Sequence, residues 1–136
     1  MAATIKLEIV TPEAKIFSGE ADIVQLTGSD GEMGIMAGHM LLMTGLVAGE
    51  ISYRFGGETT HLAVGDGFVQ ITHEKVSILT DMAIAADNID EAKAQEALQR
   101  AQARLTQKIS DEESASVQAS IANASAQLKV KRLYRK

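Results

Sequence analysis

Residues 76–94 read VSILTDMAIAADNIDEAKA, and the pattern of apolar residues changes within this stretch. At its start, Val76 and Ile78 are separated by one residue, which is the period-two spacing of a half-buried strand. Its end carries the acidic and amide residues that commonly begin helices. We therefore place a boundary near residue 86 and expect two domains, residues 1–86 and residues 87–136.

The part of the chain before this boundary has the features of short strands joined by turns. All eleven glycines lie between Gly19 and Gly67, and glycine favours turns and weakens helix interiors. Short strands with frequent turns predict an antiparallel β-sandwich or a barrel, and we expect the sandwich. Period-two alternation of apolar and other residues is found at residues 5–9, 51–55, 62–64, 69–71 and 76–78.

The part after the boundary has helical periodicity without glycine or proline. Asp87 or Asn88 is expected to cap the first helix. Ser110 and Glu113 have the spacing of a capping box, which predicts the start of a second helix. Two helices separated by a short break predict an antiparallel hairpin. The apolar stripes are Ala94, Leu98, Ala101, Leu105 and Ile109 on the first helix, and Val117, Ile121, Ala124 and Leu128 on the second.

Composition and charge narrow the classes of function. The net charge is −5, which argues against a nucleic-acid partner. There is no cysteine, so neither a disulfide nor a thiolate metal site is expected. No apolar run approaches the roughly 20 residues that span a bilayer, and the N-terminus does not resemble a secretory signal. We expect a cytosolic protein, or one held at a membrane only by its partners.

The polar residues show no recognised catalytic signature. None of the histidines, His39, His61 and His73, is spaced from another as metal ligands on a helix are. The sequence contains no nucleophile elbow, no phosphate-binding loop ending in Lys-Ser/Thr and no zinc-protease motif. We predict no catalytic residue and no metal site. Strand ends could still bring two histidines together, so a metal-binding β-barrel protein or enzyme remains an alternative.

The last eight residues carry five cations and no acid: Lys129, Lys131, Arg132, Arg135 and Lys136. Cations near the C-terminus of a helix stabilise it by a few tenths of a kcal/mol each. That effect accounts for one or two of them. The remaining charge is more typical of a surface for an acidic partner, where charge sets encounter rate and orientation.

The segment Gly28–Gly38 contains four glycines and several large apolar residues. It fits no dinucleotide-binding fingerprint, and no helical pattern follows it. It is either a turn with a bulged strand corner or a loop shaped for a partner. In the second interpretation soft apolar side chains are exposed, namely Met33, Ile35, Met36 and Met40.

Several of these segments resemble the epsilon subunit of bacterial F-type ATP synthases. The resemblance covers the whole chain and is most specific in Leu26–Ile35, LTGSDGEMGI, followed by Gly38-His39. It continues through residues 76–84 and 89–92, and the order of sandwich and helical hairpin also matches. The chain lacks the prolines that usually flank Gly-His in this family, with Ala37 before it and Met40-Leu41 after it.

The resemblance implies a rotor subunit that couples the gamma subunit to the ring of c subunits during proton-driven ATP synthesis. It implies that the sandwich docks on gamma and that Glu32 and His39 face the c-ring. It implies a peripheral location on the cytoplasmic face of the bacterial plasma membrane.

The resemblance also implies a regulatory hairpin. In such subunits the two helices fold against the sandwich or extend along gamma toward the beta and alpha subunits, where they block ATP hydrolysis. The residues implied to meet an acidic segment of a beta subunit are Lys129, Lys131 and Arg132, hereafter the tail cations. Alanine-rich stripes bury little apolar area, which favours a hairpin that can open. A hairpin packed permanently on the sandwich is the alternative.

Some members of the family bind ATP through an Ile/Leu-Asp-x-x-Arg-Ala motif at the hairpin. This chain has Ile89, Asp90, Lys93 and Ala94 at the matching positions, with lysine in place of arginine. Lysine keeps the charge but loses the planar bidentate fork of arginine. We therefore expect no bound cofactor, and an adaptor that senses nucleotide through its hairpin remains a second alternative.

Overall fold

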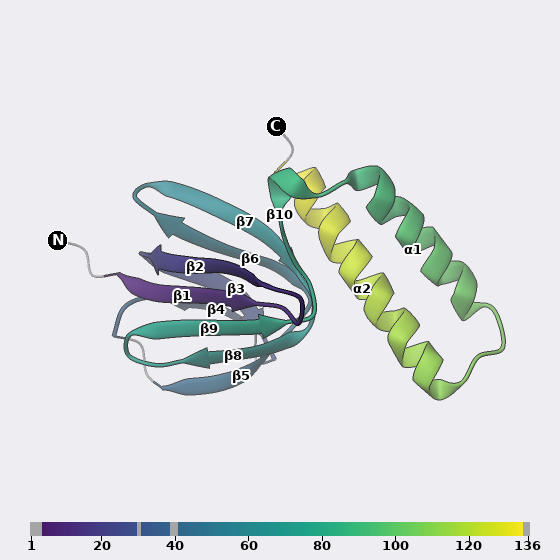
Figure 1. Cartoon of the computed structure of the whole chain (residues 1–136), viewed down its shortest axis with the longest axis horizontal. Helices are drawn as coiled ribbons and strands as arrows, with labels where there is room; N and C mark the ends of the chain where they lie inside the picture. The colour runs from purple at the N-terminus through teal and green to yellow at the C-terminus, as the bar shows by residue number, and fades with distance from the viewer. Residues whose placement is uncertain (1–3, 30, 39–40, 135–136) are drawn as a thin grey trace.

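The computed structural model describes residues 4–29, 31–38 and 41–134. Ten strands precede two helices (Figure 1). The strands are β1 (Ile5–Val10), β2 (Lys15–Ala21), β3 (Ile23–Gly28), β4 (Gly31–Ile35), β5 (Leu42–Leu46), β6 (Gly49–Phe55), β7 (Glu58–Val64), β8 (Gly67–Ile71), β9 (Lys75–Thr80) and β10 (Ala83–Ala85). They are followed by a short 3₁₀ helix, η1 (Ala86–Asn88), and by α1 (Glu91–Leu105) and α2 (Asp111–Leu133).

The strands form the predicted sandwich. Hydrogen bonding runs in the order β10-β7-β6-β3-β5-β8-β9-β1-β2, with β4 paired to β3. The hydrogen-bonded sheet continues from β3 to β5 through a single pair of residues, Gly28 and Leu46. The pairing is antiparallel except between β1 and β9, which run parallel. Parallel neighbours need a long connection, and here nearly the whole domain separates the two strands.

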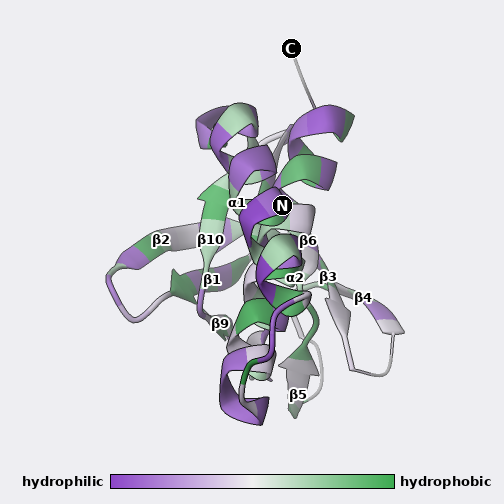
Figure 2. Ribbon diagram, turned by 90° about the vertical axis from the view of Figure 1, so that its right-hand side faces the viewer, coloured by the Kyte–Doolittle hydropathy of each residue, from purple (hydrophilic) through white to green (hydrophobic). Residues whose placement is uncertain are grey.

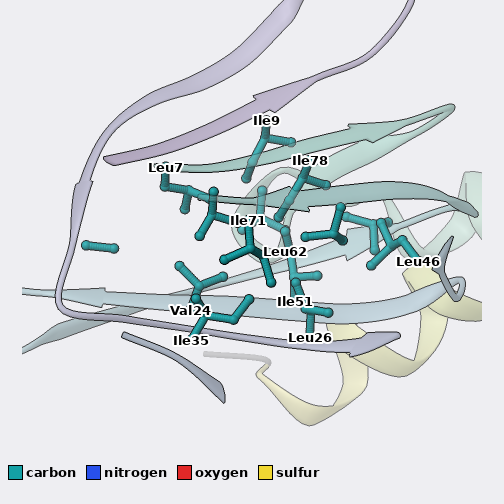
Figure 3. Packing of buried hydrophobic residues seen from close by; sticks show 14 of the residues in the cluster. Leu7, Ile9, Val24, Leu26, Ile35, Leu46, Ile51, Leu62, Ile71 and Ile78 are labelled. Carbon is teal, nitrogen blue, oxygen red and sulfur yellow. The ribbon is translucent and has the colours of Figure 1, made fainter. Parts of the chain in front are cut away.

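The core lies between the two layers, as Figure 3 shows, and is built from aliphatic side chains. In β1, Ile5, Leu7 and Ile9 are fully buried while the residues between them are not. This is the alternation expected of strands with one face against a core. The residues labelled in Figure 3 are Leu7, Ile9, Val24, Leu26, Ile35, Leu46, Ile51, Leu62, Ile71 and Ile78.

The two helices form the predicted hairpin, with two local differences. The first helix is capped by Asp90, whose carboxylate accepts a hydrogen bond from the Lys93 amide, so the prediction of Asp87 or Asn88 was wrong. Those two residues belong to η1 instead. Ile109 lies beyond the end of α1, in the loop before Ser110. The Ser110 cap of α2 is confirmed, because its hydroxyl accepts from the Glu113 amide.

The hairpin rests beside one end of the sandwich, with α2 between the strands and α1 (Figure 1). Figure 2, which faces the hairpin, shows hydrophilic segments alternating with hydrophobic ones along both helices. Within the described residues, neither helix is both long and apolar enough to cross a bilayer.

Candidate functional site

The C-terminal half of α2 is the part of the hairpin that contacts the sandwich. It packs on β6, β7 and η1 through a small buried cluster, which we call the dock. Three of its five buried members are alanines, so each contributes little apolar area. The dock consists of Ala63, Ala86, Ile89, Ala126 and Val130, flanked by the partly buried Met82, Ile84 and Tyr134.

Polar contacts surround this cluster. Asn123 of α2 donates a hydrogen bond to Asp81 in the loop between β9 and β10, with 3.5 Å between nitrogen and oxygen. Lys131 Nζ donates to the Ala86 carbonyl over 3.3 Å. These contacts tie α2 to the sandwich at two levels. Both are hydrogen bonds that solvent reaches at least in part, so each contributes only modestly to holding the hairpin.

The C-terminal end of α2 contacts β6 and β7 through Tyr134, which caps the helix, and through Glu50 and His61 on the two strands. The strand register pairs Ser52 with His61, which leaves Glu50 as a diagonal neighbour of His61 on the same face. His61 Nδ1 lies 2.7 Å from Glu50 Oε2. The His61 ring stacks on Tyr134, with ring centroids 3.5 Å apart and planes inclined by 11°. We call Glu50, His61 and Tyr134 the clasp.

Glu50 also acts on the hydroxyl of Tyr134. It raises the pKa of Tyr134 to about 12, first because the carboxylate accepts a hydrogen bond from the neutral hydroxyl. Burial and charge repulsion by Glu50 add to the shift, because both disfavour the phenolate. Tyr134 therefore joins the clasp through its ring and through its hydroxyl.

The tail cations differ in what they contact. Arg132 bridges to α1, where Nε donates to Glu91 Oε2 and Nη2 donates to Gln95 Oε1, each over 3.2 Å. Lys131 donates to the sandwich, as described above. Lys129 is exposed and lines a groove of 620 Å³. Two of the three predicted partner-binding cations are thus engaged within the chain when the hairpin is docked.

The groove lies between β3–β4, β6–β7 and the end of α2. Its walls are largely polar and include Gln25, Ser52 and Thr59. Glu32, which was predicted to face the ring of c subunits, lies on β4 at this groove and is exposed. The second predicted ring contact, His39, falls outside the described residues. The groove therefore brings Glu32 near Lys129 and the clasp, which the sequence alone did not indicate.

The residues matching the nucleotide motif have roles in the fold. Ile89 is part of the dock, and Ala94 is buried. Asp90 caps α1, and Lys93 supplies the amide for that cap while its side chain is exposed. Three of the four positions are accounted for by packing and capping.

Among the described residues, no group of three or more His, Asp or Glu side chains is arranged to hold a metal ion. His61 is engaged by Glu50. His73 lies in the turn between β8 and β9, where its carbonyl accepts from the Gly38 amide over 3.4 Å. His39 falls outside the residues described.

The outer face of β5, β8 and β9 exposes large apolar side chains. Phe68 and Leu79 are directly paired across β8 and β9, and Met43 lies on the neighbouring strand β5. Their exposed fractions are 63%, 50% and 67% for Phe68, Leu79 and Met43. A shallow groove of 320 Å³, lined by Val10 and Pro12 among others, adjoins Leu79. We call Met43, Phe68 and Leu79 the apolar face.

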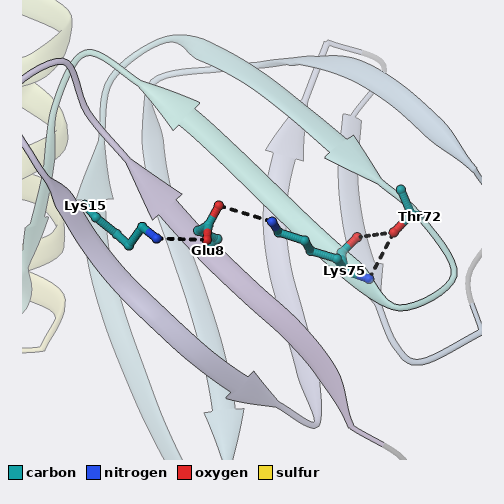
Figure 4. Close-up of polar contacts among 4 residues, drawn as sticks. All are labelled: Glu8, Lys15, Thr72 and Lys75. Carbon is teal, nitrogen blue, oxygen red and sulfur yellow. Dashed lines mark hydrogen bonds and ion pairs between the residues drawn. The ribbon is translucent and has the colours of Figure 1, made fainter.

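A row of charges on β2, β1 and β9 lies next to this face, because Lys75 and Leu79 share the outer side of β9. Figure 4 shows the members of the row. Glu8 of β1 pairs with Lys15 of β2 over 3.3 Å and with Lys75 of β9 over 3.2 Å. The hydrogen bond from Lys75, and then the one from Lys15, lower the pKa of Glu8. Thr72 holds the start of β9 by donating to the Lys75 carbonyl and accepting from its amide.

The apolar residues predicted to be exposed in Gly28–Gly38 behave differently from one another. Met36 is exposed, but Ile35 is fully buried in the core and Met33 is partly buried against it. The prediction was therefore wrong for Ile35, because β4 pairs with β3 and turns Ile35 inward. Met40 lies outside the described residues. The main apolar surface is formed instead by β5, β8 and β9.

Two family models match consecutive parts of the chain. Residues 4–86 match the ATP synthase, Delta/Epsilon chain, beta-sandwich domain. Residues 87–132 match the ATP synthase, Delta/Epsilon chain, long alpha-helix domain.

Similar proteins agree with these matches. The ATP synthase epsilon chain 2 of Syntrophotalea carbinolica is 40% identical over 131 residues, covering 96% of this chain and 95% of the relative. The ATP synthase epsilon chain of Acidithiobacillus ferridurans is 42% identical, covering 95% and 92%. A chain in the mitochondrial ATP synthase structure of Euglena gracilis (OSCP/F1/c-ring) superposes with a TM-score of 0.75 at 23% identity, covering 93% of this chain and 80% of the other.

Proposed function

Because this chain belongs to the ATP synthase Delta/Epsilon family, as an epsilon-type subunit of the central stalk without a catalytic role, we propose that it couples gamma to the c-ring and restrains ATP hydrolysis through its hairpin. Residues 1–86 form the coupling domain and residues 87–136 the regulatory one. The complex is membrane-bound, so this chain is a peripheral component on the cytoplasmic face of the bacterial plasma membrane.

The apolar face is the surface that docks on gamma. Phe68, Leu79 and Met43 are large, adjacent across the strand ladder and exposed in the isolated chain. Contiguous exposed apolar residues of this kind mark interaction sites in soluble proteins. Next to this face, Glu8 forms ion pairs with Lys15 and Lys75. These charges make a polar rim of the type that surrounds the core of an interface.

Glu32 and His39 are the proposed contacts with the polar loops of the c-ring. Glu32 supports this role by its exposure on β4, a strand paired on one side only among the described residues. A charged side chain on such a strand is free to meet a partner without disturbing the core.

The tail cations are the proposed inhibitory contact with an acidic segment of a beta subunit. In the docked hairpin, Lys131 and Arg132 donate to Ala86, Glu91 and Gln95. Extension breaks the Lys131 contact with the sandwich and gives that cation to beta. The docked and inhibitory states therefore compete for the same side chain, which makes the regulation reversible.

The observation that carries this proposal is the dock. A 23-residue helix is held on the sandwich by a cluster consisting mostly of alanine and by partly exposed polar contacts. Such a helix can leave the sandwich at a cost of a few kcal/mol. A partner that binds the extended hairpin can supply a free energy of this size and so shift the equilibrium between the docked and the extended states.

Reconstitution tests the proposal. ATP synthase depleted of this chain is assayed for proton-driven ATP synthesis and for ATP hydrolysis, before and after the full chain is added back. We expect depletion to lower synthesis and raise hydrolysis, and addition to reverse both changes. Identical rates with and without the chain contradict the proposal.

A further inference from the structure

Tyr134 has no role in the proposed coupling or in the charge contact with beta. It is the only one of the chain's five Phe and Tyr residues that follows residue 86. The structure nevertheless seats it at the end of α2, stacked on His61 at a centroid distance of 3.5 Å. Tyr134 stands among cations at the end of α2, and its ring joins this end of the helix to the sandwich.

The geometry around Tyr134 is that of a two-point attachment. Its ring covers the His61 ring at an angle of 11°, and the Glu50 carboxylate acts on its hydroxyl, whose pKa it raises. Glu50 in turn lies 2.7 Å from His61 Nδ1. Each of the three side chains therefore interacts with the other two. Glu50 comes from β6 and His61 from β7, and Tyr134 is the residue that caps the C-terminus of α2. Hydrogen-bonded groups in such a closed set support one another.

We propose that Glu50, His61 and Tyr134 form a clasp that sets the balance between the docked and the released hairpin. The dock beneath it consists mainly of alanine, so the clasp supplies the most specific contact between α2 and the strands. Any effect of the clasp on ATP hydrolysis rests on the proposed function. Its effect on the docking of α2 is a property of the isolated chain and is tested there.

The position of the clasp makes it effective. It lies at the far end of α2, and among the described residues the other polar contacts between α2 and the sandwich are at Asn123 and Lys131. Loss of the clasp frees the last turn first, and the Lys131 contact lies one turn before it. Release therefore begins at the end of the helix that carries the tail cations.

Thiol protection measures docking directly. The chain has no cysteine, so Ala126→Cys places a single thiol in the dock, where Ala126 is 5% exposed. Its reaction with a thiol reagent requires release of α2. A second reporter, Ala21→Cys, lies in the sandwich core, where Ala21 is 0% exposed, and reacts only when the sandwich opens.

Clasp variants are then compared on both reporters. Tyr134→Phe keeps the stack and removes the hydroxyl, and we expect labelling at position 126 to accelerate about fivefold. Tyr134→Ala removes both contacts and is expected to accelerate it on the order of fiftyfold. Leu133→Ala is the control, since Leu133 is 59% exposed on the same turn. Labelling at position 21 stays unchanged in all three.

A double-substitution cycle tests whether the members act together. His61→Ala and Tyr134→Ala combined are expected to accelerate labelling much less than the product of the two single effects. Equal labelling of Tyr134→Ala and Leu133→Ala at position 126, or single effects that multiply, overturns the clasp. Faster labelling at position 126 with unchanged hydrolysis in the assembled enzyme supports the clasp and contradicts the proposed function instead.

Discussion

Enlarging one alanine in the dock should release the hairpin and strengthen inhibition. Ala63 is fully buried, and its side chain points from β7 toward α2, whereas Leu62 and Val64 on either side face the sandwich core. Ala63→Leu inserts three carbons where Ala126 and Val130 pack. Overpacking of this kind costs about 1–3 kcal/mol. Because the sandwich core lies on the other face of the sheet, this free energy lowers the stability of the docked hairpin rather than that of the sandwich.

A cost of about 2 kcal/mol corresponds to roughly a 30-fold shift from the docked to the released hairpin. The assay is ATP hydrolysis by the reconstituted enzyme, with thermal unfolding of the isolated chain measured alongside. We expect lower hydrolysis with Ala63→Leu and little change in the unfolding of the sandwich. Ala115→Leu makes the same chemical change at an exposed position of α2 and should leave hydrolysis unaltered.

The reasoning is refuted if Ala63→Leu releases the hairpin, as judged by faster labelling of a thiol at position 126, while hydrolysis stays at the wild-type rate. In that case the hairpin moves without acting as an inhibitor. Unchanged labelling refutes the structural part instead, because it means that α2 tolerates the added volume where it is.

Three further predictions concern the charged and apolar surfaces. Replacing the tail cations by glutamine should weaken inhibition at low salt. The difference between variant and wild type should be smaller at high salt, because screening already removes part of the attraction. Equal hydrolysis by the variant and the wild type at both salt concentrations contradicts this. Phe68→Ser should weaken binding to isolated gamma roughly 10- to 100-fold, as loss of an apolar anchor does, whereas Gln70→Ser on the same outward face should not; titration calorimetry measures both. Glu8 has a lowered pKa in the folded state, so its contribution to stability is present above its ordinary pKa of 4.5 and is lost as pH falls through the lowered value. Glu8→Gln should therefore be less stable than wild type at neutral pH and equally stable once the pH lies below the lowered pKa of Glu8, as denaturant unfolding at each pH would show.

The sequence predicted the two-part architecture because its signals were local. Alternation in β1 and β9 and the Ser110 cap of α2 depend on neighbouring residues only, and the structure has them as expected. In β6 the alternation fails, because Ser52 is buried and Phe55 is exposed. The cap of α1 was misplaced by a few residues, because Asp87, Asn88 and Asp90 are all competent caps and the 3₁₀ helix before α1 selects among them.

Features that depend on which elements meet could not be read from the sequence. Ile35 faces the core because β4 pairs with β3, and the glycine-rich segment gives no alternation to reveal it. The parallel pairing of β1 with β9 joins residues nearly 70 positions apart. The second buried stripe of α2, Ala126 and Val130, appears only once the helix has a sheet to pack on.

The candidate site was predicted in part for the same reason. The tail cations were evident as a charge run, but their partners in the docked state were not. Glu50 and His61 are unremarkable in the sequence, and the diagonal register of β6 and β7 brings them together. Tyr134 could have been noticed as the lone aromatic residue of the helical part, yet its partner could not have been named.

The most direct test is to fix the hairpin in place and measure hydrolysis. Asp81 and Asn123 are joined by a hydrogen bond between loop and helix, and the chain has no other thiol to interfere. Asp81→Cys with Asn123→Cys, bridged by a short reducible cross-linker in the assembled enzyme, holds α2 on the sandwich. We predict hydrolysis at the uninhibited rate with the bridge intact, normal ATP synthesis, and return of inhibition after reduction. Inhibition that is equally strong before and after reduction contradicts the account.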